Sequence, residues 1–193
     1  MRLGLWDNKI YKLTLIDCRM KKSVNRTYLG SIVLGLNDAL VELTGVLAGL
    51  TLALANSQII LISGFITGFA ASLSMAGSEY LSTKAECNHT KKDKKAGICR
   101  SPSKAAAYTG GAYFLTVLFL LFPYLVLSNV IHALMWTLVN AVIVIAAFTY
   151  YATIERGESY FHRFFEMLAI SMGVAAISFG MGYLIRIWVG VGV

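Results

Sequence analysis

The chain has 193 residues, of which 57% are hydrophobic and only 14% are charged, and its formal net charge is +7. A soluble domain carries about 25% charged residues, so this chain lacks the charge needed to cover a solvated surface. The composition therefore excludes a soluble enzyme, a secreted disulfide scaffold and a nucleic-acid-binding domain, and no nucleic-acid partner is expected.

Residues 1–27 form a basic segment in front of the first apolar run. Leu3, Trp6, Ile10 and Leu13 follow the three- and four-residue spacing of an amphipathic helix. We predict that this segment is a helix lying in the cytoplasmic membrane interface. A disordered basic arm is the alternative.

Two long stretches, Leu43 to Ser78 and Ala105 to Ile154, contain no charged side chain. As single helices they would measure about 54 and 75 Å, whereas the hydrocarbon core of a bilayer is about 30 Å thick. Each stretch is therefore predicted to fold back as two spans, with breaks at 55–58 and 128–129. Pro123 is expected to kink or end the helix that contains it.

A last apolar run between Glu166 and Arg186 completes an all-α integral membrane protein with five transmembrane helices per subunit. The predicted spans are 28–54, 59–82, 105–127, 130–152 and 162–188. The organisation is then a segment 1–27, a first helix pair 28–81, a short basic loop 82–104 and three further helices within 105–193. Glu166, beside Arg163, is expected to form an ion pair at the membrane interface.

The basic residues indicate the orientation of the chain. They gather before the first span and between the second and third, while the loops at 55–58 and 128–129 have none. Because basic loops stay in the cytoplasm, the N-terminus is predicted inside and the C-terminus outside. We find no cleavable signal peptide and no organellar targeting segment, which favours the plasma membrane of a prokaryote.

The first span contains two acidic residues, Asp38 and Glu42, one helical turn apart. At 100° per residue they fall within a narrow face that also carries Gly45 and Gly49. Small residues at this spacing let membrane helices approach closely. In the second span, Gly64, Gly68, Met75 and Glu79 similarly share one face.

Packing alone can explain the four glycines, but it does not explain the acids. An ionisable side chain within a span is costly and faces the bundle interior or water, so it marks a functional site by default. The first two spans contain no Lys or Arg to neutralise Asp38 and Glu42. A proton or a metal cation must do so, and exchange between the two is the chemistry of a cation/proton antiporter. Carboxylates with one thioether favour a first-row divalent ion over Na⁺ or K⁺.

A second group of metal-ligating residues lies on the cytoplasmic side. Cys87, His89 and Cys99 are in the basic loop, and Glu155 and Glu158 precede the last span. They could capture metal at the inner mouth, although their spacing matches no common zinc pattern. Unpaired, reduced thiols in a solvated loop are the simpler interpretation.

Two segments carry a family resemblance: GLNDALVELTGVLAGLTLAL at 35–54 and SLSMAGSEYLSTKAE at 72–86. They resemble the first two transmembrane helices of the vacuolar iron transporter (VIT) family, and the five-span layout is also similar. The resemblance implies a homodimeric Fe²⁺ or Mn²⁺ exporter that exchanges metal for protons through a pathway between subunits. It implies that Asp38 and Met75 line that pathway, with Glu42 and Glu79 at further acidic positions of the motif.

The chain departs from better-known members of that family in one respect. They carry a glutamate- and methionine-rich metal-binding domain between the second and third spans, whereas here that segment is short and basic. The resemblance therefore supports the membrane core more strongly than it supports iron specificity. The expected partners are metal ions, protons, the bilayer and a second copy; no cofactor is expected. Transport of another cation is one alternative. A membrane protein that only builds an oligomer through its small-residue faces is the other.

Overall fold

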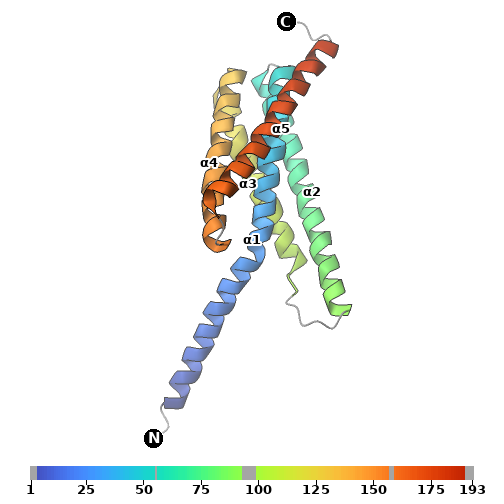
Figure 1. The fold of residues 1–193 in the computed structure, drawn as a ribbon. Helices are drawn as coiled ribbons and strands as arrows, with labels where there is room; N and C mark the ends of the chain where they lie inside the picture. The colour runs from blue at the N-terminus through green and yellow to red at the C-terminus, as the bar shows by residue number, and fades with distance from the viewer. Residues whose placement is uncertain (1–3, 55, 93–98, 157–158, 190–193) are drawn as a thin grey trace.

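The computed structural model describes residues 4–54, 56–92, 99–156 and 159–189, with side chains for 28–54, 56–88, 99–153 and 159–188. This described part contains helices and short connections and no strand. Figure 1 shows the five helices, which are α1 (Gly4–Leu54), α2 (Ser57–Lys92), α3 (Pro102–Val126), α4 (Val130–Arg156) and α5 (Tyr160–Val189).

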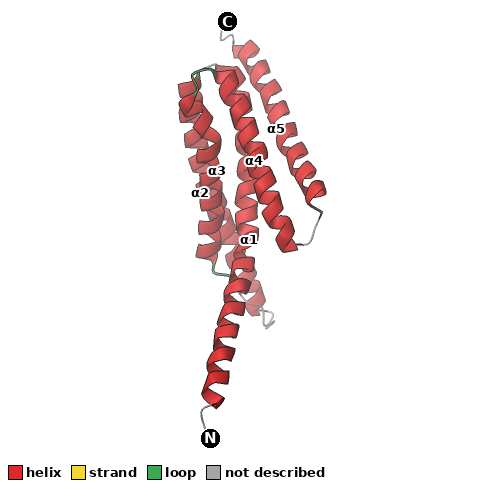
Figure 2. Ribbon diagram, turned by 90° about the vertical axis from the view of Figure 1, so that its left-hand side faces the viewer, coloured by secondary structure: helices red, strands yellow, loops and turns green. Residues whose placement is uncertain are grey.

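Each helix contains a segment long and apolar enough to cross a membrane. These segments are Tyr28–Leu54, Ser57–Asn88, Pro102–Val126, Val130–Thr153 and Tyr160–Trp188. The predicted all-α protein with five membrane spans is therefore confirmed, and the protein is a multi-pass membrane protein. The two ends of the chain lie at opposite ends of the bundle (Figures 1 and 2), as an odd number of spans requires.

Helix α1 differs from the prediction at its N-terminal end. The predicted interfacial helix and the first span are one continuous helix without a break near residue 27. Figure 1 shows the N-terminal half of α1 extending beyond the other helices, tilted relative to its membrane segment. The orientation of this segment relative to the membrane plane stays a prediction. No proline lies between Gly4 and Leu54 to interrupt the helix.

Asparagine side chains begin the helices that follow both short turns. The Asn56 Oδ1 atom accepts hydrogen bonds from the backbone N–H groups of Gln58 and Ile59, at 3.0 and 3.2 Å. The Asn129 Oδ1 atom accepts the equivalent bonds at the start of α4, at 3.1 and 3.2 Å. Asparagine is among the best N-caps because it satisfies N–H groups that have no partner within the helix. Both predicted breaks are confirmed.

The end of α3 also agrees with the sequence. Pro123 lies in the last turn, and the helix stops at Val126. The backbone N–H of Leu127 donates to the Pro123 carbonyl at 2.9 Å and closes this turn. Helix α2, in contrast, continues to Lys92, well beyond the predicted end of its span at residue 82.

Helix α1 contacts each of the other four helices, and α5 crosses it diagonally in Figure 1. A Cβ atom at Gly45 would lie 2.9 Å from Val174 Cγ1, and one at Gly182 would meet the backbone carbonyl of Gly49. The missing side chains therefore let α1 and α5 touch through their backbones.

Glycines serve the α2–α3 contact in the same way. A Cβ at Gly64 would lie 2.8 Å from Leu121 Cδ2, and one at Gly68 would lie 2.5 Å from Val117 Cγ1. The small-residue faces of the first two spans are thus used within a single subunit.

Candidate functional site

The four residues predicted to handle metal, Asp38 and Glu42 on α1 with Met75 and Glu79 on α2, are called here the acid flank. The helices run antiparallel, and a hydrogen bond of 2.6 Å from Ser31 Oγ to Glu79 Oε1 joins them. Ser31 lies two turns before Asp38, and Met75 lies one turn from Glu79 on the same face of α2. This contact therefore shows that the segments of α1 and α2 that carry the acid flank lie on neighbouring helices.

Glu42 is held by a residue that the sequence analysis did not identify. The Tyr113 hydroxyl on α3 donates a hydrogen bond to Glu42 Oε2 at 2.8 Å. Tyr113 is completely buried, whereas Glu42 is exposed at the surface of the single chain. Tyr113 thus orients one carboxylate oxygen and leaves the rest of the group accessible. The sequence signal was a phenol in the middle of an apolar span, since a buried tyrosine hydroxyl needs a polar partner.

Asp38 has no such partner. Its side chain is half-buried, and within the described side chains it accepts no hydrogen bond and forms no ion pair with a lysine or arginine. Glu42 and Glu79 also lack a basic neighbour within ion-pair distance in the same part of the chain. The three carboxylates therefore keep oxygen lone pairs available for a cation.

One chain alone does not assemble a full coordination shell. Among the described residues, no group of three or more His, Cys, Asp and Glu side chains lies close enough to hold a metal ion. The Met75 side chain is partly buried against the core. The acid flank therefore offers dispersed carboxylate oxygens and one sulfur rather than a closed, cage-like site.

The second predicted group of ligands receives a correction. The Cys87 and Cys99 sulfur atoms are joined as a disulfide, with their Cα atoms 5.3 Å apart. The chain returns from α2 to the start of α3 and brings Cys99 against the buried Cys87. The expectation that these thiols are unpaired is therefore wrong for this structure. Sulfur atoms joined in a disulfide are also not thiolate ligands for a metal ion. The side chains of His89, Glu155 and Glu158 lie outside the described residues.

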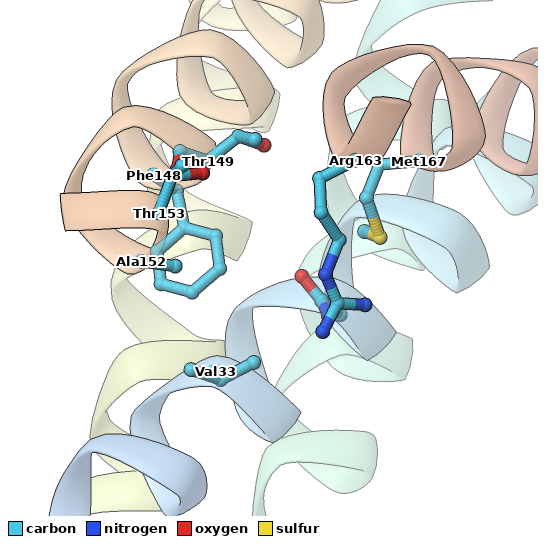
Figure 3. A pocket seen from close by; sticks show the side chains of 8 residues that line it. Val33, Phe148, Thr149, Ala152, Thr153, Arg163 and Met167 are labelled. Atoms are coloured by element: carbon cyan, nitrogen blue, oxygen red, sulfur yellow. The ribbon is translucent and has the colours of Figure 1, made fainter. Parts of the chain in front are cut away.

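A separate polar pocket of about 30 Å³ lies between α1, α4 and α5. Figure 3 shows Arg163 and Met167 reaching into it from α5, opposite Val33 of α1. Asn37 also lines it, and its Oδ1 atom is buried without a hydrogen-bond partner. The pocket has room for about one water molecule. Arg163 Nη1 also lies 4.0 Å from Glu166 Oε2, which is the ion pair expected from the sequence.

The fold and the acid flank define a class: a helical multi-pass membrane protein whose spans contain carboxylates that no base among the described side chains neutralises. A comparison with protein families then gives the assignment. The model of the VIT family matches residues 29–98 and 92–183, which is most of the chain, so the chain belongs to the VIT family. A search of curated proteins found no match. Membership of this family indicates a membrane transporter of metal ions.

Proposed function

We propose that the protein exports Fe²⁺ or Mn²⁺ from the cytosol in exchange for protons, through a pathway between two copies of the chain. The observation that carries this proposal is the exposure of Glu42 within the membrane segment Tyr28–Leu54. A charged group at the centre of a bilayer costs about 2.5–3.5 kcal/mol on insertion scales. The surface that carries Glu42 must therefore face something other than lipid.

We infer that a second copy of the chain covers the surface that carries Glu42. A two-fold interface brings the same patch of both subunits together. It would present Asp38 and Glu42 twice, and Met75 twice, around one axis. Such an interface supplies the ligands that one chain lacks, and the described residues of one chain contain no closed cluster of their own.

The residues then have distinct roles. Ionised Asp38 and Glu42 bind the metal ion, because a carboxylate must lose its proton to act as a ligand. Protons that arrive from the opposite side replace the metal and release it. Tyr113 holds Glu42 in place through its 2.8 Å hydrogen bond. Met75 adds a soft sulfur ligand, which favours first-row transition metals over Mg²⁺.

The basic residues indicate how the bundle is oriented in the membrane. The end of the bundle with the N-terminal half of α1 and the α2–α3 connection carries most of the lysines and arginines. This end faces the cytoplasm by the positive-inside rule. Glu79 lies nearer to it than Met75 does, so metal reaches Glu79 first and then passes to Asp38. The membrane is the plasma membrane of a prokaryotic cell.

Flux in proteoliposomes tests the proposal. The purified full chain is reconstituted, and entry of Fe²⁺, Mn²⁺, Zn²⁺, Co²⁺ and Mg²⁺ is followed under an imposed pH gradient. We expect Fe²⁺ and Mn²⁺ flux that depends on the gradient and is abolished in Asp38→Asn. Glu166→Gln is the matched control, since this carboxylate pairs with Arg163 away from the flank. Wild-type flux in Asp38→Asn would reject the assigned role, and metal flux that neither responds to the pH gradient nor moves protons would reject proton exchange.

A further inference from the structure

A second surface of the bundle has the features of a lipid-binding site. A cleft of about 520 Å³ lies between α1, α3 and α4, and we call it the aromatic cleft. Its walls are aliphatic, including Leu36, Ile143 and Val144, and its rim carries Tyr28, Tyr108 and Tyr151. The volume falls in the range of about 300–1,000 Å³ that holds small ligands. No acidic residue lines the cleft in the described part of the chain.

The three tyrosines lie at one level of the bundle. Tyr28 is the first residue of the α1 membrane segment, Tyr108 is in the second turn of α3, and Tyr151 is two residues before the end of the α4 segment. The Tyr28 and Tyr108 rings lie 5.3 Å apart. Tyrosines gather where hydrocarbon meets the headgroups, because the ring is apolar and the hydroxyl is polar. The rim therefore marks the membrane interface at the basic end of the bundle.

A positive charge stands beside this rim. Lys104 is exposed and precedes Tyr108 by one helical turn, so both side chains lie on the same face of α3. Tyr108 and Tyr151 are also exposed, so their hydroxyls remain accessible from the lipid side. A lysine and phenol hydroxyls above an aliphatic cleft match an anionic headgroup above an acyl chain.

We propose that the aromatic cleft binds an anionic phospholipid of the same leaflet, with one acyl chain between α1 and α4 and the phosphate at Lys104. The tyrosine hydroxyls hydrogen-bond to the phosphate or ester oxygens. Cytoplasmic leaflets are rich in anionic lipids, which basic residues near the surface attract. The cleft lies on a different side of α1 from the acid flank, since Leu36 is about 160° from Asp38 and about 120° from Glu42 around the helix. This proposal is therefore independent of the proposed transport.

Photo-crosslinking with the full chain tests the site. Phosphatidylglycerol and phosphatidylcholine analogues with the same diazirine-bearing acyl chain are incorporated with the protein into liposomes, and labelled peptides are mapped by mass spectrometry. We expect both to label the α1 and α4 walls of the cleft, and phosphatidylglycerol to label them several-fold more. Lys104→Gln should bring the ratio of the two lipids close to one. Lys84→Gln, on α2 over the Tyr80 ring, is the control and should leave the ratio unchanged.

Filling the cleft gives the complementary result. Ala147→Phe should reduce labelling of the cleft walls by both lipids, and Ile143→Trp, one helical turn away and also exposed, serves the same purpose. Labelling spread evenly around the bundle would overturn the site. An unchanged ratio in Lys104→Gln would overturn the anionic preference. Crosslinks from cysteines placed in the cleft to a second copy of the chain would show that a subunit, and not lipid, occupies it.

Discussion

Two successive stretches along one face of α1 show how a single helix serves packing and, as we propose, ion binding within a few turns. Toward α5, Gly45 and Gly49 allow backbone contact, and the hydroxyls of Thr44 and Ser171 lie 3.2 Å apart. The Ser171 hydroxyl also donates to the Leu40 carbonyl at 3.3 Å. On the acid flank, Asp38 has no hydrogen bond within the described side chains and Glu42 has a single phenol.

The difference has a physical basis. On the α5 side, polar groups satisfy one another, so that surface is rigid and has no capacity for a ligand. On the acid flank the same helix leaves carboxylate oxygens unsatisfied. A span retains such groups only where a cation, a proton or water takes their place.

The largest effect on stability should come from disrupting the contact between α1 and α5. Gly182→Leu places a side chain where α5 meets the Gly49 backbone carbonyl, which cannot move aside as a side chain can. Overpacking costs about 1–3 kcal/mol even where side chains can adjust, so we expect a loss above this range. Unfolding in detergent, followed by circular dichroism, measures it. Gly180→Leu is the control, because a Cβ at Gly180 meets nothing within 4 Å. Equal stability of the two variants would show that the helices do not touch at Gly182.

Tyr113→Phe should reduce metal flux without changing any residue of the acid flank. The change removes the donor to Glu42, and loss of a group that orients a metal ligand typically costs about 10–100-fold in affinity or activity. We expect metal flux to fall about tenfold. Tyr124→Phe is the matched control, since it removes a buried hydroxyl that lies 2.6 Å from Thr51 Oγ1 and away from the flank. Similar flux in both variants would mean that Tyr113 is only structural.

Met75→Leu should change selectivity more than total flux. Leucine has a similar volume but no sulfur, so the fold is kept while the soft ligand is lost. We expect the ratio of Fe²⁺ to Mg²⁺ transport to fall in competition assays. Met167→Leu, which alters the separate polar pocket instead, should leave the ratio at its wild-type value. An unchanged ratio in Met75→Leu would argue against a thioether ligand.

The smallest effect is expected at Asn37. Its Oδ1 atom is buried without a partner, and such a group costs about 1–3 kcal/mol. Asn37→Leu should therefore raise the free energy of unfolding by about 1 kcal/mol. Asn140→Leu should lower it, because the Asn140 side-chain amide donates to the Phe119 carbonyl at 3.4 Å. A clear loss of stability in Asn37→Leu would show that the polar pocket holds a partner for this amide.

Hydropathy and charge predicted the spans because the bilayer fixes helix length and excludes charge. They could not predict where α1 begins, since a basic amphipathic segment is compatible with an in-plane helix and with a continuation of the span. The Asn56 and Asn129 caps were available in the sequence as asparagines at the predicted breaks. Their capping role was not recognised there.

For the candidate site, the sequence predicted which residues share a face of one helix but not which helices meet there. The spacing of Asp38 and Glu42 places them on one face, and the glycines share that face in the sequence. That α5 covers Gly45 and Gly49 while Glu42 stays exposed depends on the diagonal crossing of α5, which no local pattern encodes. Tyr113 and Ser31 reach the acids from 71 and 48 residues away in sequence, so their roles emerge only from tertiary contacts.

The turns at the end of the bundle away from the N-terminus limit how that end can open. Helix α1 ends at Leu54 and α2 begins at Ser57, while α3 ends at Val126 and α4 begins at Val130. The asparagine side chains hold these connections against the helix starts. Links of this length are too short to fold over an exit as a lid. In the proposed transport, access from that side would therefore change by tilting or sliding of whole helices.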